Sequence, residues 1–486
     1  MSIATQTDSY KFGSHWNMYP KGTQYVYSYF ESRKGAKFPL TPLFGLQYIM
    51  QEYLCGDKGT PTDEQFDRAV KISKAHFPFG GGFNEDGWEY IKDTHPKCLP
   101  IRIKAVPEGL PVPTGNVLMT VENLDPEVPW LTGHVEDILT HVWYPSTVCA
   151  LSRRVKEMIL GHLQASSDSL AMLPFMLHDF GYRGVSTHEG GMIGGAAHLV
   201  NFLGTDTIPA MECAMDYYGA SLDGLAFSVP ASEHSIMTAL GPSGEAEVVQ
   251  SLLRKYESGI LSVVADSYDI YNFVENFVCG EFRERILSRD GVFVIRPDSI
   301  SPIHKTPSEQ VLWIVQTLAS KMGYTKNSKG FIVINPKVRV LWGDGLEIEA
   351  IDDILTVLIK NGFSADNMAT FGMGGGLLQK VNRDTQRFAF KSSAQCRDGQ
   401  WSDIYKSPKD LSKASKRGRL KLINQNGEFK TVKESDPGTD ILETVFEYGQ
   451  MIKYQTFAEI RQRAEVIPDW TQRNLSDQPP ENTYDK

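Results

Sequence analysis

Four aspartates, Asp206, Asp266, Asp298 and Asp344, each stand at the end of a short apolar run in this chain of 486 residues. Carboxylates in such places can bind ribose hydroxyls, or hold Mg²⁺ through water, because Mg²⁺ usually keeps several waters and uses few carboxylates. The alternative for any one of them is to cap a helix. Four aspartates in equivalent places favour a site for a sugar or a metal.

A glycine-rich segment and an arginine suggest a phosphate group as part of the ligand. Gly372 and the three glycines at 374–376 follow a predicted strand and precede a helical pattern, so their backbone N–H groups could hold a phosphate. A tight turn that needs small residues is the alternative. Arg296 beside Asp298 favours the phosphate, because a guanidinium fork suits a diphosphate, although a structural Arg–Asp pair is the other interpretation.

His234 and Phe180 are the remaining candidates for chemistry. His234 follows another apolar run, and the neighbouring Glu233 could orient its ring and raise its basicity, which suits a proton shuttle or a nucleophile toward phosphate. Phe180 and Tyr182 flank Gly181, where an exposed aromatic ring could stack on a flat heterocycle. The alternatives are a structural histidine and core packing.

Seven short apolar runs, each followed by Gly, Asp, Arg or His, must position these residues. Their polar ends lie about 20–45 residues apart, which is the spacing of βα units. Polar residues at the carboxyl ends of parallel strands build the active site of a (β/α) barrel. We therefore predict a barrel-like α/β domain over residues 166–384. The runs are Phe175–Leu177, Val200–Leu203, Leu225–Val229, Leu261–Ala265, Val292–Ile295, Val338–Trp342 and Met368–Phe371.

The two ends of the chain have a different pattern. Residues 101–106 and 116–121 are typical of strands, and residues 146–163 are typical of a helix. We predict an additional α+β domain in which an N-terminal region, residues 1–165, packs with a C-terminal region, residues 385–486.

Composition and charge narrow the class of protein. The chain has 49 Lys and Arg against 59 Asp and Glu, a net charge of −10, and 41% of its residues are hydrophobic, which excludes disorder over the whole chain. The acidic balance argues against a binder of nucleic acid or of anionic membranes. Six scattered cysteines without a C-x-x-C pair, no leader pattern and no long apolar run indicate a cytoplasmic protein without a membrane segment.

One basic stretch, residues 406–421, departs from this balance. It has Tyr405 beside it but no series of interleaved aromatic residues, so it gives poor support for stacking of single-stranded nucleic acid. A solvated loop or a clamp over phosphates fits better. From the residues alone we infer a barrel enzyme that acts on a phosphorylated sugar, and the pattern does not name the reaction.

These residues lie within longer motifs that closely resemble the nicotinamide phosphoribosyltransferase family over nearly the whole chain. The motifs are Thr7–Lys11, Tyr27–Arg33, Ile103–Gly109, His178–Gly184, Gly204–Thr207, Ser228–Ser235, Asp266–Asp269, Arg296–Ser299, Gly343–Gly345 and Gly374–Lys380. The resemblance implies transfer of the phosphoribosyl group of phosphoribosyl pyrophosphate to nicotinamide, giving nicotinamide mononucleotide for NAD salvage. It also implies a homodimer with shared active sites.

The resemblance assigns roles to individual residues. It implies that Phe180 and Tyr10 sandwich the pyridine ring, with Tyr10 supplied by the second subunit. It implies that Asp206 accepts a hydrogen bond from the carboxamide and repels nicotinate. It places other residues in substrate binding, with Asp8 and Arg33 arriving from the second subunit. Those supplied by the same chain are Arg183, Ser228, Arg296, Asp298, Gly343, Asp344, Gly374, Gly375, Arg383 and Lys391.

The resemblance also implies a role for ATP as co-substrate. It identifies His234 as the residue that ATP phosphorylates, with Glu233, Asp266 and Asp298 nearby, so that ATP hydrolysis favours product formation. The implied mechanism is displacement of pyrophosphate from the anomeric carbon by the pyridine nitrogen. Mg²⁺ is expected to be held mainly by the substrate diphosphate and waters, and with the cationic side chains it would stabilise the departing group.

Several positions depart from the family pattern, and other interpretations stay open. Ile300 and Ser301 replace the usual Gly-Asn after Ser299, and Met373 and Ala389 replace serines, which bears on phosphate affinity and the ATP step. The nearest alternative is a nicotinate phosphoribosyltransferase, distinguished by Asp206. A non-catalytic nucleotide-binding protein of the same fold is a further one, against which intact His234 and Arg296 argue. Without the resemblance, a barrel hydrolase or aldolase would be the choice.

Overall fold

The computed structural model describes residues 2–406 and 415–466, which fall into two units. The first holds the described residues up to Ala150, together with Cys213–Ala220 and Val381–Ala464. The second holds Leu151–Glu212 and Ser221–Lys380. The sequence analysis placed the division at residues 165 and 384, whereas the structure divides the chain within a long helix and assigns a short internal segment to the first unit.

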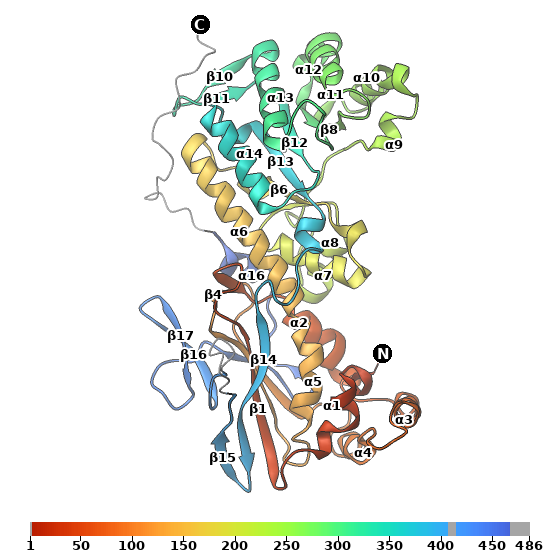
Figure 1. Ribbon diagram of the computed structural model, residues 1–486, viewed down its shortest axis with the longest axis vertical. Coiled ribbons are helices and arrows are strands. Elements are labelled where there is room, and N and C mark those ends of the chain that lie inside the picture. The colour runs from red at the N-terminus through yellow and green to blue at the C-terminus, as the bar shows by residue number, and fades with distance from the viewer. Residues whose placement is uncertain (1, 407–414, 467–486) are drawn as a thin grey trace. The chain divides into compact units, whose positions relative to one another are not determined.

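The second unit is built on a curled parallel sheet in the strand order β7-β6-β13-β12-β9-β8. Strands β6, β8, β12 and β13 are labelled in Figure 1. Each neighbouring pair is parallel, so all carboxyl ends meet at one edge. The strands are β6 (Leu177–Asp179), β7 (Gly204–Thr205), β8 (Ser258–Val264), β9 (Asp290–Arg296), β12 (Val338–Trp342) and β13 (Met368–Met373). The α/β class with a barrel-like sheet is confirmed.

An irregular segment links the two edge strands of this sheet. Phe227 forms a parallel bridge with Gly204 of β7, and Ala231 forms one with Ser262 of β8. Backbone hydrogen bonds flank both bridges, including Phe227 N–H to the carbonyl of Leu203. Pro230, which has no N–H, lies between the bridges, so a regular ladder cannot form there. The segment closes the sheet into a ring. It also brings the residues that follow it to the side of the sheet where the strands have their carboxyl ends.

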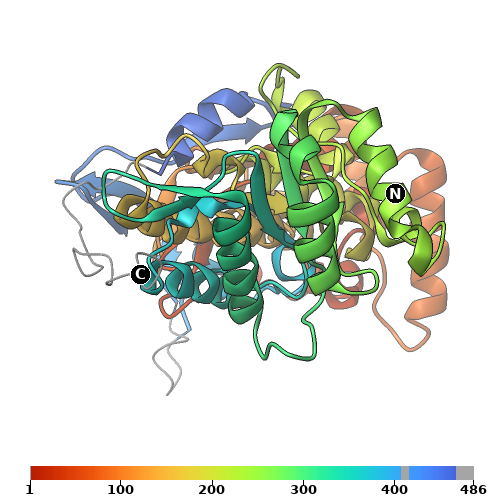
Figure 2. The same ribbon diagram turned by 90° about the horizontal axis from the view of Figure 1, so that it is seen from above.

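Helices return the chain between these strands, yellow to teal in Figure 2. The longest of them, α13, begins after Thr306, whose hydroxyl accepts from Glu309 N–H at 3.2 Å, with Pro307 in the first turn. The strands beneath read as continuous apolar runs because both faces are covered. The helices are α7 (His188–Leu199), α9 (His234–Met237), α10 (Glu245–Lys255), α11 (Ile270–Asn272), α12 (Arg283–Ser288), α13 (Pro307–Met322), α14 (Ile348–Lys360) and α15 (Gly375–Leu378), and β10 (Tyr324–Lys326) pairs with β11 (Ile332–Ile334).

The first unit contains a seven-stranded sheet that joins both ends of the chain, in the order β15-β14-β1-β5-β3-β18-β19. The long strands β1 and β14 pair antiparallel and lie side by side in Figure 1. The strands are β1 (Thr23–Ser32), β3 (Ile101–Ala105), β5 (Val117–Asn123), β14 (Phe388–Arg397), β15 (Gln400–Asp403), β18 (Glu443–Glu447) and β19 (Gln450–Met451). Two two-stranded antiparallel sheets accompany it. One pairs β2 (Leu40–Pro42) with β4 (Pro111–Pro113), and the other pairs β16 (Leu420–Gln425) with β17 (Glu428–Lys433).

Two helices of this unit, α3 and α4, begin with a side-chain cap. Thr62 and Gln65 form a reciprocal capping box at the start of α3. Helices α6 and α8 contain residues of both units. No helix in residues 2–406 and 415–466 is long and apolar enough to cross a membrane. The helices are α1 (Ser9–Gly13), α2 (Leu46–Ile49), α3 (Asp63–His76), α4 (Glu85–Thr94), α5 (Leu131–Thr140), α6 (Trp143–Ser166), α8 (Ile208–Tyr218) and α16 (Phe457–Ala464).

Candidate active site

The carboxyl edge of the parallel sheet gathers the predicted site residues of the second unit. Phe180 follows β6, Asp206 follows β7, and Asp266 follows β8. Ser228 lies in the bridging segment, and Glu233 and His234 come after it. Arg296 ends β9, Gly343 and Asp344 follow β12, and Gly374 and Gly375 follow β13. These functional groups therefore all lie at the carboxyl ends of the strands, on one side of the sheet.

Asp206 is held by two hydrogen-bond donors that converge on one of its oxygens. His178 Nε2 lies 2.8 Å from Oδ1, and the hydroxyl of Ser228 donates to the same oxygen at 2.9 Å. Burial acts to raise the pKa of Asp206, but the hydrogen bond and charge of His178, together with Ser228 and Arg296, outweigh it and lower the pKa below the ordinary value. Asp206 is therefore ionised at neutral pH, while 52% of its side chain stays exposed to a ligand.

Phe180 forms a flat platform between a cation and two glycines. The guanidinium carbon of Arg296 lies 5.1 Å from the ring centroid, a cation–π contact. A Cβ built at Gly372 would lie 2.0 Å from the ring, and one at Gly343 would lie 3.1 Å from it. The ring can take this place because Gly372 of β13 and Gly343 after β12 have no side chain.

His234, the first residue of α9, lies between two carboxylates. Its Nε2 is 3.2 Å from Asp266 Oδ1, and its Nδ1 is 3.9 Å from Asp298 Oδ2. The other oxygen of Asp266 accepts a hydrogen bond from Ser299. With 48% of its side chain exposed, His234 is an oriented ring that an incoming ligand can reach. The sequence analysis proposed Glu233 as the group that orients this ring; in the structure Asp266 holds it, and Glu233 accepts from the hydroxyl of Ser235.

Three aspartates at neighbouring strand ends are close enough to influence one another. Burial, together with the charges of Asp298 and Asp266, raises the pKa of Asp344. Arg296 compensates part of this charge by donating from Nη2 to Asp298 Oδ1 at 3.1 Å. Within residues 2–406 and 415–466 no group of three or more His, Cys, Asp or Glu side chains is arranged to hold a metal ion by itself. The arrangement suits a hydrated cation that brings its own ligands.

The glycine-rich loop after β13 is held against the turn after β6. The N–H of Phe180 donates to the carbonyl of Met373 at 3.1 Å, and the Gln379 side chain donates to the carbonyl of Gly181 at 3.2 Å. Met373, a departure from the family pattern, is fully buried. The following helix α15 has only four residues, so any phosphate contact would rest on the loop itself. Ser301 lies at the other position where the sequence departs from the family pattern, and its N–H donates to Gln310 Oε1 at 2.6 Å.

The remaining predicted site residues come from other segments of the chain. Arg183 belongs to the second unit and is exposed. Asp8, Tyr10, Arg33, Arg383 and Lys391 all belong to the first unit. Asp8 N–H donates to Asp137, Arg33 Nε donates to the carbonyl of Arg387, and Lys391 Nζ lies 3.9 Å from Glu31; Tyr10 is 53% exposed and Arg383 is exposed.

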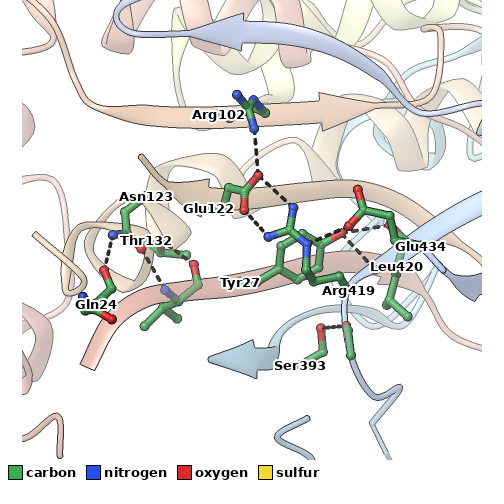
Figure 3. Close-up of polar contacts among 12 residues, drawn as sticks. Gln24, Tyr27, Arg102, Glu122, Asn123, Thr132, Ser393, Arg419, Leu420 and Glu434 are labelled. Carbon is green, nitrogen blue, oxygen red and sulfur yellow. Dashed lines mark hydrogen bonds and ion pairs between the residues drawn. The ribbon is translucent and has the colours of Figure 1, made fainter. Parts of the chain in front are cut away.

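Two cations of the basic stretch, Lys416 and Arg419, form ion pairs within the first unit. Lys416 binds the carboxylate of Glu31, and Arg419 binds Glu122 at 2.6 Å and Glu434 at 2.7 Å (Figure 3). These charges are therefore neutralised by side chains of their own unit. Lys409 and Lys413, which the sequence analysis included in a possible phosphate clamp, lie outside the described residues.

Comparison with known proteins defines the class of the chain. A model of the nicotinate phosphoribosyltransferase (NAPRTase) family matches residues 175–450, and one of the nicotinamide phosphoribosyltransferase N-terminal domain matches residues 2–103. The fold resembles human nicotinic acid phosphoribosyltransferase, with a TM-score of 0.56 at 13% identity over 95% of this chain and 93% of that one. A nicotinate-nucleotide pyrophosphorylase from Pyrococcus furiosus gives 0.55 at 14% identity, covering 91% and 88%. The chain is thus a phosphoribosyltransferase of the barrel type.

Curated relatives narrow the assignment. A nicotinamide phosphoribosyltransferase of Xanthomonas campestris pv. campestris is 43% identical over 477 residues, covering 96% of this chain and 98% of that protein. One from Acinetobacter baylyi is 30% identical over 491 residues, covering 94% and 95%. The chain belongs to the nicotinamide phosphoribosyltransferase family.

Sequence reasoning missed His178 as a member of the site. It quoted His178 only as the first residue of a motif, although the two-residue period of a strand places residues 178 and 180 on one face. Combined with the choice of Phe180 as a platform, this period was the signal that could have found it.

Proposed function

We propose that this protein transfers the phosphoribosyl group of phosphoribosyl pyrophosphate to nicotinamide, forming nicotinamide mononucleotide and pyrophosphate in NAD salvage. The observation that carries the proposal is the ionised carboxylate of Asp206, fixed by His178 and Ser228 near the Phe180 platform. A carboxylate accepts from the carboxamide N–H of nicotinamide and repels the carboxylate of nicotinate. The names of the two curated relatives support the same substrate.

The site would act mainly by holding the pyridine ring. Phe180 would bind one face of the ring, and Asp206 would fix its rotation through the carboxamide. The ring nitrogen then forms a bond to the anomeric carbon while the bond from that carbon to the diphosphate oxygen breaks, through an oxocarbenium-like state. No general base is needed, since the neutral ring nitrogen already carries a lone pair.

The diphosphate would be bound by cationic and metal-bound groups. Arg296 offers its guanidinium, and the raised pKa of Asp344 beside Asp298 and Asp266 marks a place where a cation is favoured. Asp298 and Asp344 would hold Mg²⁺ through waters. When bound, Mg²⁺ would supply positive charge that stabilises the departing diphosphate. Arg183, Arg383 and Lys391 are proposed as further phosphate contacts.

ATP would act through His234. Its ring is exposed, and Asp266 orients it through Nε2. We propose that a ring nitrogen attacks the terminal phosphorus of ATP and releases ADP, and that hydrolysis of the phosphohistidine favours product formation. Asp298 Oδ2 lies 3.9 Å from His234 Nδ1, and Glu233 precedes His234 in the chain. Both are close enough to His234 to influence its phosphorylation.

The active enzyme would be a homodimer with shared active sites. Tyr10, with Asp8 and Arg33, would be supplied by the second subunit, where Tyr10 would cover the free face of the pyridine ring. The exposed side chain of Tyr10 supports this assignment, since a ring of this size is available to another surface.

The test is synthesis by the purified chain from phosphoribosyl pyrophosphate, Mg²⁺ and nicotinamide, followed by chromatography. Formation of nicotinamide mononucleotide, faster with ATP, is the expected result. Formation of product from nicotinate alone would move the assignment to the sister enzyme, and no product from either base would contradict the proposal.

A further inference from the structure

His178 contacts both parts of the pyridine site. Its Nε2 lies 2.8 Å from Asp206 Oδ1, and its ring centroid lies 5.3 Å from that of Phe180 at an angle of 60°. An ionised Asp206 can only accept a hydrogen bond, so the proton of this contact belongs to Nε2 of the imidazole. The side chain of His178 is 12% exposed, which leaves it little room to turn away from Asp206.

The geometry of this contact determines which oxygen of Asp206 faces a ligand. His178 and Ser228 both donate to Oδ1, so that Oδ2 remains available. Two donors on one oxygen also fix the rotation of the carboxylate. A side chain that must accept a hydrogen bond from an amide N–H and repel a carboxylate at the same place needs this fixed orientation.

The backbone makes room for this arrangement. Strands β6 and β7 pair in parallel with His178 opposite Gly204. A Cβ at position 204 would lie 2.7 Å from Nδ1 of His178, so the absence of a side chain there lets the ring take its place. The strand that carries Phe180 and the strand that precedes Asp206 are thus joined through one imidazole.

We propose that His178 is a positioning residue for the choice between amide and acid, acting by holding Asp206 in the orientation that receives the carboxamide. The inference rests on the proposed function, since it concerns the selectivity of that same site. His178 touches the selector and not the reacting atoms, so its loss should raise KM for nicotinamide more than it lowers kcat.

The test compares matched variants in steady-state kinetics with nicotinamide and with nicotinate. His178→Phe keeps a ring of similar shape without a donor, and His178→Gln restores an N–H donor. His162→Phe is the control, because His162 forms an equivalent pair with Asp352 at 2.7 Å, between helices α6 and α14. We expect His178→Phe to lower the amide-to-acid ratio of kcat/KM about tenfold or more, the loss expected for one hydrogen bond to a charged group. His178→Gln should recover most of that loss, and the control should keep the parent ratio.

A double variant separates positioning from general damage. In an Asp206→Asn background, the further change His178→Phe should alter the ratio less than about twofold, because its target is already gone. If His178→Phe does not fold, His178→Ala takes its place in the same comparison. An unchanged ratio in the His178 variants, equal ratios for Phe and Gln, or full additivity with Asp206→Asn would overturn the inference alone. A parent that makes no product from nicotinamide would overturn the proposed function as well.

Discussion

At the scale of single residues, Asp206 combines the two properties that selecting an amide over an acid requires, a negative charge and a fixed direction. The charge follows from the lowered pKa, and the direction from the donors on Oδ1. His234 is the residue that we propose for phosphate chemistry, and its ring is exposed yet oriented by Asp266. Each role can be tested by one substitution.

Asp206→Asn should relax the preference for the amide. The neutral side chain offers an N–H donor to nicotinate and no longer repels it, so the amide-to-acid ratio of kcat/KM should fall about tenfold or more. Steady-state kinetics with both bases measure this. Asp352→Asn serves as the control, since Asp352 also pairs with a histidine but on helix α14. An unchanged ratio in Asp206→Asn would refute its role as selector.

His234→Ala should retain measurable synthesis without ATP and lose the stimulation by ATP. The substitution removes the nucleophilic nitrogen while the pyridine platform at Phe180 stays in place. Rates with and without ATP, together with ADP release and acid-labile phosphate on the protein, are the measurements. Equal stimulation in the variant and the parent would contradict a phosphohistidine at this position.

At the scale of elements, the carboxyl ends of β12 and β13 must stay bare for the platform to form. Gly343 and Gly372 both approach the ring of Phe180, and Gly372 does so within 2.0 Å of a hypothetical Cβ. The chemistry of the site thus depends on strand positions that bear no functional group.

Gly372→Ala should displace the Phe180 ring and raise KM for nicotinamide about tenfold to a hundredfold, because small displacements of a binding group are costly. Gly161→Ala is the control: this glycine lies in α6 with nothing within 4 Å of a built Cβ, and alanine there should stabilise by about 0.5 to 1 kcal/mol. Steady-state kinetics and urea unfolding of both variants check the prediction. An unchanged KM in Gly372→Ala would show that the ring does not need this space.

The sequence predicted most of the strands because their apolar runs are buried on both faces. Residues 338–342 form β12 as expected, and residues 292–295 lie inside β9. Three predictions were wrong or only partly right. Of residues 175–177, only Leu177 lies in β6, because Leu173–Phe175 form a 3₁₀ helix. Residues 200–203 follow α7, and the strand there is only the next two residues, since a short apolar run does not distinguish a buried helix end from a strand. Residues 225–229 form a single bridge, for which Pro230 gives the reason.

The site could be predicted less completely than the fold. The strand-end pattern correctly placed Asp206, Asp266, Asp298 and Asp344 after the carboxyl ends of strands, because parallel strands end on one side of a sheet. The pairing of His234 with Asp266 rather than Glu233 could not be predicted, since it depends on how α9 turns after the bridging segment. Contacts between residues distant in sequence leave no local signal of their own.

At the scale of the whole molecule, the buried acid Glu245 contributes to the pH dependence of stability. Glu245, at the start of α10, is 3% exposed, and its Oε1 has no hydrogen-bond partner among residues 2–406 and 415–466. Burial, with the charges of Asp269 and Asp266, raises its pKa from 4.5 to about 7. The folded state therefore binds this proton more tightly than the unfolded state, so stability falls as the pH rises from about 4.5 to about 7.

Glu245→Gln should remove the part of this decline that Glu245 contributes, while Glu108, whose pKa burial also raises to about 7, keeps its own part. The neutral side chain mimics the protonated acid. The free energy of unfolding of the variant should therefore equal that of the parent below about pH 4.5, and should exceed it above about pH 7 by on the order of 1 to 3 kcal/mol. Urea unfolding at several pH values measures the difference. Parallel pH profiles for the variant and the parent would show that Glu245 does not carry the dependence.

The proposed dimer predicts complementation between inactive subunits. Tyr10→Ala and Asp298→Ala should each lose most activity as homodimers. Mixed after reversible dissociation, they should form heterodimers with one intact site, built from Asp298 of one subunit and Tyr10 of the other, and recover up to about half the activity per heterodimer. Synthesis assays on the mixture provide the measurement. Activity that stays at the average of the two separate variants would exclude shared sites.

The most direct test of the central claim is a competition between the two bases in one reaction. Equal concentrations of nicotinamide and nicotinate are offered with phosphoribosyl pyrophosphate and Mg²⁺, and the two mononucleotides are separated by chromatography at early times. The ionised, oriented Asp206 predicts nicotinamide mononucleotide in large excess. Equal amounts of the two products, or an excess of nicotinate mononucleotide, would contradict the account.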